Sequence, residues 1–269
     1  MFSEKQFTEF SNAFYLLSGI KITKDKKYLI ENRLGKYIGQ GKTYPSFSAM
    51  LDSLIYQKSK KTKHLLINAL TTNYSYFFRD IAHFRFLAYL LKNKKQEDGF
   101  PVRIWSAACS SGEELYSIAI TADLIIPGFT NSQVMILGSD ISPKMIQTAG
   151  EGSYSATGMI QKISPNILTR YFEKSGEEDG MYTIKGEIRK KVRIERLNLM
   201  GDYSFTKQFD VVFLRNILIY FNIEEKEILI NKISNYIKPG GYLILGLSEN
   251  IRGMDIHFES KKFSIYKKQ

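Results

Sequence analysis

Cysteine and histidine are scarce in this chain, and their scarcity argues against several kinds of site. The 269 residues include one cysteine, Cys109, and three histidines, His64, His83 and His257. One cysteine cannot form an intrachain disulfide, and the histidines lack the spacing of metal ligands. We therefore expect neither a disulfide-stabilised secreted domain nor a metal centre, and a reducing, cytoplasmic setting is the default interpretation.

Long hydrophobic runs are also missing. The chain has no run of about 18 or more apolar residues, so we expect no transmembrane helix. Met1–Gln6 is not a basic segment followed by an apolar one, so we expect no signal peptide. With 43% hydrophobic and 24% charged residues the composition is that of a globular protein. We expect a monomer that does not insert into membranes.

Acidic residues are few in the first third of the chain. Residues 1–95 carry 17 Lys and Arg against 6 Asp and Glu, whereas residues 96–269 carry 21 of each sign. The whole net charge of +11 therefore lies in the first segment. Such asymmetry indicates an acidic partner for the N-terminal part. The alternative is a lysine-rich, solvated helical surface.

Apolar periodicity predicts a basic all-α domain over residues 1–95. Ser3 and Gln6 match a capping box ahead of an apolar helical stripe that begins at Phe7. Further helices are expected from about Lys24, from Ser46, around 65–70 and over 82–94. A polar linker, 94–99, follows.

From residue 96 strands alternate with helices, which predicts a Rossmann-like α/β domain over 96–269. The expected strands are 102–105, 134–139, 209–214 and 242–247, with a turn at 238–241 and a final antiparallel strand at 262–266. Residues 172–199 break this alternation, because 181–185 and 192–199 resemble a hairpin. We expect a small antiparallel β-subdomain inserted at about 172–199.

The segment Ile104–Glu114, IWSAACSSGEE, is the most informative in the chain. It joins a strand to a helix through small residues, which allow a ligand to approach the backbone. It contains neither the G-x-G-x-x-G of dinucleotide folds nor a P-loop. Glu113 and Glu114 occupy the helix N-terminus, where an anion would otherwise bind. The segment therefore indicates a cofactor with hydroxyls or positive charge rather than a pyrophosphate, and S-adenosylmethionine is the first candidate.

Other polar residues follow predicted strands at the edge where open α/β sheets bind ligands. Asp140 is placed either to accept hydrogen bonds from ribose hydroxyls or to cap a helix. Arg215 and Asn216 interrupt an apolar stretch, which predicts a carboxylate ligand or an ion pair for the arginine. Cys109 is interpreted as a packing residue rather than a nucleophile.

One further segment, Thr71–Asp80 with the sequence TTNYSYFFRD, joins the two predicted parts. Its hydroxyls, amide, arginine and aromatic rings suit a segment that closes over a ligand between domains. The alternative is a packed hinge.

Taken together, these segments resemble the CheR family of S-adenosylmethionine-dependent methyltransferases, which esterify glutamates on bacterial chemoreceptors. The resemblance covers nearly the whole chain. It rests on TTNYSYFFRD at 71–80, IWSAACSSGEELYSIA at 104–119, LGSDIS at 137–142, LNL at 197–199, FLRNILIYF at 213–221 and IKPGGYLILGLSEN at 237–250.

The resemblance implies a role for particular residues. Arg79 and Tyr220 would lie nearest the transferred methyl group as catalytic residues. The cofactor pocket would be lined by Asn73, Ser75, Arg79, Glu114, Asp140, Asn198, Leu199, Arg215 and Asn216. Departures from the family pattern are mild: Ser75 replaces the usual threonine, and Leu115 stands where proline often occurs.

The resemblance also implies partners. The substrates would be acidic cytoplasmic helices of transmembrane chemoreceptors, and the β-subdomain would be the place for a receptor C-terminal peptide. Two alternatives stay open: a catalytically silent adapter that binds S-adenosylmethionine, and a nucleic-acid methyltransferase. Against the second, the chain lacks an N/D-P-P-Y/F motif, and no nucleic-acid partner is expected.

Overall fold

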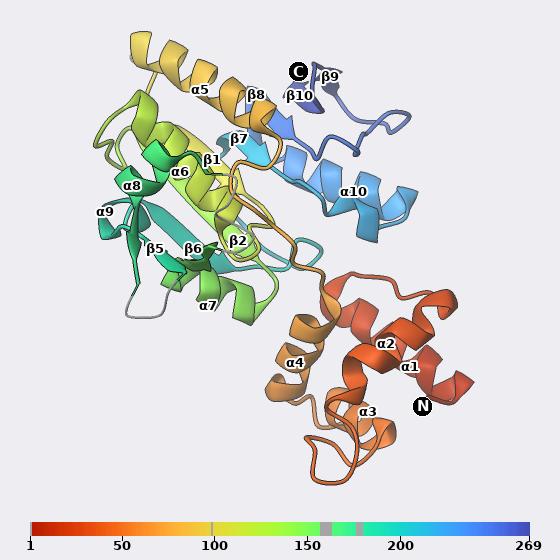
Figure 1. Cartoon of the computed structure of the whole chain (residues 1–269). Helices are drawn as coiled ribbons and strands as arrows, with labels where there is room; N and C mark the ends of the chain where they lie inside the picture. The colour runs from red at the N-terminus through yellow and green to blue at the C-terminus, as the bar shows by residue number, and fades with distance from the viewer. Residues whose placement is uncertain (1, 98, 157–162, 176–179) are drawn as a thin grey trace.

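The computed structural model describes residues 2–97, 99–156, 163–175 and 180–269, which form a helical part and an α/β part (Figure 1). The helical part comes first in the chain and lies at one end of the molecule. Its elements are α1 (Glu4–Ser18), the 3-10 helix η1 (Lys24–Lys26), α2 (Lys27–Gly35), α3 (Phe47–Ile55) and α4 (Lys60–Leu70).

The core of the helical part is built from the apolar stripes of these helices. Phe7, Phe10 and Phe14 of α1 are buried there, and residues of α2 to α4 pack in the same cluster. The last buried residue in sequence that belongs to it is Leu70. Burying each phenylalanine contributes about 1.5–3 kcal/mol to folding. The capping box predicted at Ser3 is present, since its side chain accepts from the Gln6 backbone and Gln6 bonds back to the Ser3 N–H.

Helix α5 (Ile81–Gln96) packs with the α/β part. Phe84, Leu87 and Leu91 lie in the same buried cluster as Leu115 of α6 (Glu113–Ile125). The predicted boundary after residue 95 therefore does not follow the packing, because periodicity shows that α5 has an apolar face but not which element covers it.

The α/β part contains a seven-stranded sheet in the order β6-β2-β1-β7-β8-β10-β9. Strands β6, β2, β1, β7 and β8 are parallel, and β10 pairs antiparallel with both β8 and β9. The strands are β1 (Val102–Ser106), β2 (Val134–Asp140), β6 (Val192–Arg196), β7 (Phe209–Phe213), β8 (Ile237–Ile244), β9 (Phe258–Ser260) and β10 (Ile265–Lys268). The predicted α/β class, with a late antiparallel strand, is confirmed.

Helices cover both faces of this sheet. Besides α5, the described residues of the α/β part form the helices α6 (Glu113–Ile125), α7 (Pro143–Glu151), α8 (Pro165–Tyr171), α9 (Gly186–Arg189), the 3-10 helix η3 (Leu218–Tyr220) and α10 (Ile223–Ser234). One buried cluster joins α5 and α6 to Ile104 and Val211, and a second joins α10 to Trp105 and Val212. Neighbouring strand residues enter opposite clusters, as period-2 alternation requires.

A second, three-stranded antiparallel sheet has the order β3-β5-β4. Its strands are β3 (Ser153–Ser155), β4 (Phe172–Lys174) and β5 (Met181–Ile184). The expected small antiparallel sheet is therefore present. The predicted pairing of 181–185 with 192–199 is wrong, because β6 does not pair with β5 but extends the main sheet beside β2. Alternation marks both segments as strands but carries no information about their partners.

The predicted turn at 238–241 is also wrong. These residues lie inside β8, which is parallel to β7 and shows a register irregularity between Phe209 and Val211. Gly240, with φ of 75°, takes a left-handed conformation within the strand. The Pro-Gly-Gly sequence therefore marks a distortion of the strand instead of its beginning.

Among the described residues, no helix has both the length and the hydropathy needed to cross a membrane. The same residues contain no group of three or more His, Cys, Asp or Glu side chains arranged to hold a metal ion.

Candidate functional site

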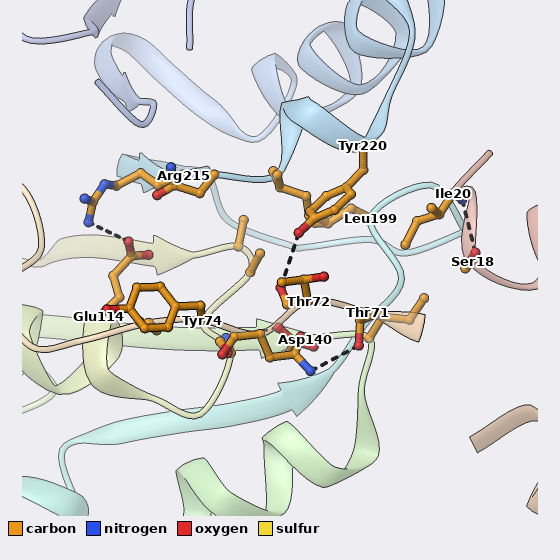
Figure 2. A pocket seen from close by; sticks show the side chains of 18 of the residues that line it. Ser18, Ile20, Thr71, Thr72, Tyr74, Glu114, Asp140, Leu199, Arg215 and Tyr220 are labelled. Carbon is orange, nitrogen blue, oxygen red and sulfur yellow. Dashed lines mark hydrogen bonds and ion pairs between the residues drawn. The ribbon is translucent and has the colours of Figure 1, made fainter. Parts of the chain in front are cut away.

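A cleft with about 950 Å³ of empty space, partly open to solvent, lies at the carboxyl ends of the parallel strands (Figure 2). Residues that directly follow β1, β2, β6 and β7 line it, as expected for an open α/β sheet. The linker 71–79 and two residues of the helical part complete its wall. The lining residues are Ser18, Ile20, Thr71, Thr72, Asn73, Tyr74, Ser75, Arg79, Ala107, Ala108, Ser110, Glu114, Asp140, Ile141, Leu197, Asn198, Leu199, Arg215, Asn216, Ile217, Tyr220 and Phe221.

All ten residues that the family resemblance singled out lie in this cleft. They come from five segments that are distant in sequence, and the fold brings them together. The roles given to them in binding or catalysis remain predictions.

A buried ion-pair network forms the inner wall of the cleft. Arg215 Nη1 donates to Glu114 Oε2 at 2.9 Å, and Arg215 Nη2 donates to Asp80 Oδ2 at 2.7 Å. The same Nη2 also contacts the carbonyl of Arg79 at 2.8 Å, and Glu114 Oε1 accepts from Ser106 Oγ at 2.7 Å. The ion pair predicted for Arg215 is thus present, and it ties the linker at 79–80 to the first turn of α6.

Glu113 and Glu114 are neighbours in sequence but have different environments. Successive residues of a helix point about 100° apart, so only Glu114 faces the cleft. Glu113 is fully buried and accepts from Ser111 Oγ at 2.8 Å. Burial raises the pKa of its carboxyl group. Of the two carboxylates at this helix N-terminus, only Glu114, the one that the resemblance names, therefore lines the cleft.

Asp140 lies at the end of β2 and is 8% exposed. Its Oδ2 accepts from the Ser110 N–H at 3.0 Å, and its Oδ1 accepts from the Ser142 N–H at 2.9 Å. Burial raises the pKa of this carboxyl group, and the hydrogen bonds from Ser142, Ser110 and Ile141 oppose that rise. Asp140 is therefore not the cap of α7, since that cap is Ser142, whose N–H it bonds. It faces the cleft, and its contact with ribose hydroxyls stays a prediction.

The turn between β1 and α6 is tightly built. Ser110 has a left-handed φ of 50°, and Gly112 has a φ of 100°. A Cβ atom at Gly112 would lie 2.9 Å from Tyr154 Oη and 3.1 Å from Ala149 Cα, so only glycine fits there. Strained non-glycine backbone such as that of Ser110 is concentrated at ligand sites, because the surrounding structure must enforce it.

The linker at 71–80 lies across the cleft. Tyr220 Oη donates to the Thr72 carbonyl at 3.3 Å (Figure 2). Ser110 Oγ donates to the Asn73 carbonyl at 3.1 Å. Arg79 Nη1 donates to the Tyr74 carbonyl at 3.3 Å. The bonds from Ser110 and Tyr220 attach the linker to the turn after β1 and to η3 after β7, so it forms part of the site as well as a connection between the two parts.

The helical part touches the cleft near the end of α1. Asn198 Nδ2 donates to the Leu17 carbonyl at 3.2 Å, and Asn198 Oδ1 accepts from the Met200 N–H at 3.0 Å. Leu199 is 5% exposed. Asn198 therefore joins the loop after β6 to the helical part beside Ser18 and Ile20.

Sequence reasoning missed several lining residues. Ala107, Ala108 and Ser110 could have been identified from the sequence, because they belong to the small-residue turn after β1. Ser18 and Ile20 could not, since only the packing of α1 against the 198–221 region brings them to the cleft. Cys109 is 1% exposed, and burial raises its pKa well above the usual range, which agrees with a packing role.

The lining suits a nucleoside cofactor that carries a positive charge. Two carboxylates line the cleft, Asp140 at the end of β2 and Glu114 in the first turn of α6, and the lining also includes apolar residues such as Ile141, Leu197 and Leu199. An apolar wall with a few fixed polar groups is the usual composition of a cofactor site.

Comparison with known proteins gives consistent matches. Residues 73–267 match the family described as CheR methyltransferase, SAM binding domain. The chemotaxis protein methyltransferase of Vibrio parahaemolyticus is 34% identical over 260 residues, which cover 96% of this chain and 93% of that protein. Chemotaxis protein methyltransferase 1 of Pseudomonas aeruginosa is 35% identical, covering 90% and 88%, and the Borreliella burgdorferi chemotaxis protein methyltransferase is 36% identical, covering 87% and 84%.

These matches cover the linker, the cleft and both sheets. They agree with the cofactor inferred from the turn after β1, which is S-adenosyl-L-methionine. The chain therefore belongs to the CheR methyltransferase family.

Proposed function

We propose that this protein transfers the methyl group of S-adenosylmethionine to glutamate side chains of chemoreceptors, giving glutamyl methyl esters for sensory adaptation. The observation that carries the proposal is the cleft itself, where the residues that the resemblance assigns to the cofactor lie together with Arg79 and Tyr220. The names of the related chemotaxis methyltransferases support the same assignment.

The chemistry requires little from the protein. A glutamate carboxylate has a reference pKa of about 4.3 and is already an ionised nucleophile at neutral pH. The reaction therefore needs no general base, which agrees with a described cleft lining that contains no histidine. The protein has to align the reactants and limit access of water.

The residues of this chain fit the cofactor. When bound, S-adenosylmethionine supplies a methyl group activated by the sulfonium. Asp140 would accept hydrogen bonds from the ribose hydroxyls, and Glu114, held by Arg215 and Ser106, would favour the positively charged end.

Arg79 and Tyr220 would act on the incoming substrate. A guanidinium donates two parallel hydrogen bonds to a carboxylate, so Arg79 would orient the glutamate for in-line attack. The Tyr220 hydroxyl now bonds the Thr72 carbonyl and would steady the substrate or the methyl group.

The charge of the helical part supports an acidic partner. Residues 1–70, which contain its core, carry 12 Lys and Arg against 5 Asp and Glu. Such a surface attracts acidic receptor helices and speeds their association. We assign the small sheet β3-β5-β4 as the place for a receptor C-terminal peptide, and the cytoplasm as the compartment.

A labelling experiment tests the proposal. The protein is incubated with S-adenosylmethionine labelled on its methyl group and with membranes that contain the host's chemoreceptors. The receptor band is then treated with alkali. Release of the label as volatile methanol is expected, because esters hydrolyse in alkali. An alkali-stable label would indicate N-methylation, and no label despite cofactor binding would indicate a silent adapter.

A further inference from the structure

Glu249 is a buried carboxylate that lies behind the cleft without lining it. It follows β8 and is 5% exposed. Its Oε2 accepts from the N–H groups of Asn216 at 2.7 Å and Gly246 at 2.8 Å, and its Oε1 accepts from the Leu218 N–H at 2.9 Å. One side chain thus bonds the backbone of two loops that follow neighbouring strands.

The loop that Glu249 bonds is the one that supplies the cleft after β7. This segment, Arg215–Tyr220, carries four lining residues, among them Asn216, Ile217 and Tyr220. Asn216 has a left-handed φ of 58°, a conformation that a non-glycine residue holds only when its surroundings enforce it. The Glu249 carboxylate enforces it by bonding the N–H of Asn216 and that of Leu218 two residues later.

The backbone of Gly246 packs closely against the Glu249 carboxylate and the Asn216 side chain. A Cβ atom there would lie 2.8 Å from Asn216 Nδ2 and 2.9 Å from Glu249 Oε2. The carboxylate, the Asn216 side chain and the Gly246 backbone are therefore closely packed, so a displacement of any one moves the others.

We propose that Glu249 is a positioning residue, which fixes the segment Arg215–Tyr220 in the conformation that binds S-adenosylmethionine. It touches neither cofactor nor substrate in this assignment and acts through the backbone of the segment. The proposal concerns cofactor binding alone, so it does not depend on which group accepts the methyl.

The role requires a carboxylate. An ionised glutamate accepts hydrogen bonds on both oxygens, whereas glutamine replaces one oxygen with an NH₂ donor. In Glu249→Gln at least one backbone N–H would face another donor, and that N–H would be buried without a partner. The effect reaches the cleft because Arg215, at the start of the segment, bonds Glu114 and Asp80.

The test separates positioning from general stability with a matched control. Asp123 is also a buried carboxylate, 7% exposed, which accepts from the Gly128 N–H at 2.9 Å and pairs with Arg170 and Lys191, but it does not line the cleft. The full-length wild type, Glu249→Gln and Asp123→Asn are compared by thermal unfolding without ligand and by calorimetric titration with S-adenosylhomocysteine. We expect both variants to unfold at lower temperature, and only Glu249→Gln to bind the ligand tenfold or more weakly.

A second variant covers the case in which Glu249→Gln does not fold. Gly246→Ala keeps the carboxylate but pushes its Cβ against Asn216 and Glu249, so binding should also weaken tenfold or more. If a folded Glu249→Gln protein binds within twofold of wild type, or if Asp123→Asn loses as much affinity, the assignment is overturned. If Glu249→Gln does not fold and Gly246→Ala does, the affinity of Gly246→Ala is the test: tenfold weaker binding supports the assignment, and binding within twofold of wild type overturns it.

Discussion

The helical part and the α/β part of this chain differ in charge and in their share of the site. Residues 1–70 carry 12 basic against 5 acidic residues, whereas residues 71–269 carry 26 against 22. The helical part contributes Ser18 and Ile20 to the cleft, and all other lining residues belong to the linker or the α/β part. The excess of positive charge therefore lies in the helical part, whereas nearly all the side chains that line the cleft lie in the linker and the α/β part.

This separation suits two different requirements, attraction of an acidic partner and methyl transfer. Long-range attraction depends on net charge and tolerates imprecise placement, whereas methyl transfer depends on atoms placed to a fraction of an ångström. A basic helical part can serve the first requirement and a rigid sheet edge the second. The linker at 71–80 belongs to both, since it connects the parts and carries Arg79.

The largest effect is expected at Arg79. Arg79→Ala removes the group proposed to orient the substrate carboxylate, so kcat should fall about 100- to 1,000-fold, as when a preorganised donor is lost. The measurement is methyl transfer to receptor membranes, with thermal unfolding as the check on folding. Arg85→Ala, on the exposed side of α5, is the matched control and should keep full activity. Wild-type activity in Arg79→Ala would show that Arg79 does not orient the substrate carboxylate.

A smaller loss is expected at Asp140. Asp140→Ala removes the proposed ribose contact and leaves the N–H groups of Ser110 and Ser142 without their acceptor. The cost should be roughly 1–3 kcal/mol in the binding of S-adenosylhomocysteine, measured by calorimetry. Asp202→Ala, an exposed aspartate outside the cleft, is the control. Unchanged affinity in Asp140→Ala would show that the residue only holds the turn and the α7 N-cap residue.

Charge reversal tests the helical part directly. Replacing Lys21, Lys26 and Lys36, all exposed, with glutamate should raise the KM for receptor several-fold at low salt and leave cofactor affinity unchanged. The matched variant replaces the exposed Lys190, Lys207 and Lys262 of the α/β part. An equal rise in KM for both variants would mean that net charge matters and its location does not. Raising the salt concentration should reduce the difference.

The smallest effect is expected from the buried Glu113. Burial raises its folded pKa above the usual 4.5, so the folded protein holds the proton at a pH where the unfolded chain has lost it. Its contribution to stability is therefore greatest in acid and declines as pH rises from 4.5 through the folded pKa, by about 1.4 kcal/mol for each pH unit that separates the unfolded and folded pKa values. Glu113→Gln, measured by denaturant unfolding, should gain stability relative to wild type as pH rises from about 4 to about 7. A constant difference between the two proteins across this range would contradict the raised pKa.

The sequence by itself identified the α/β class, the strand ends that carry Asp140 and Arg215, and the turn before Glu114. These features are local, because periodicity, small residues and a polar residue after an apolar strand are visible without knowing what packs where. Through the resemblance, it also named ten residues that meet in one cleft.

Only the tertiary structure decided which elements pair. Helix α5 joined the α/β part, β6 joined the main sheet, and the 238–241 segment became strand, because each choice depends on a partner far away in the chain. The same holds for the site, where α1 supplies Ser18 and Ile20 and the backbone bonds to Glu249 span about 30 residues. Local sequence encodes the shape of an element, and the burial of its apolar face selects the partner.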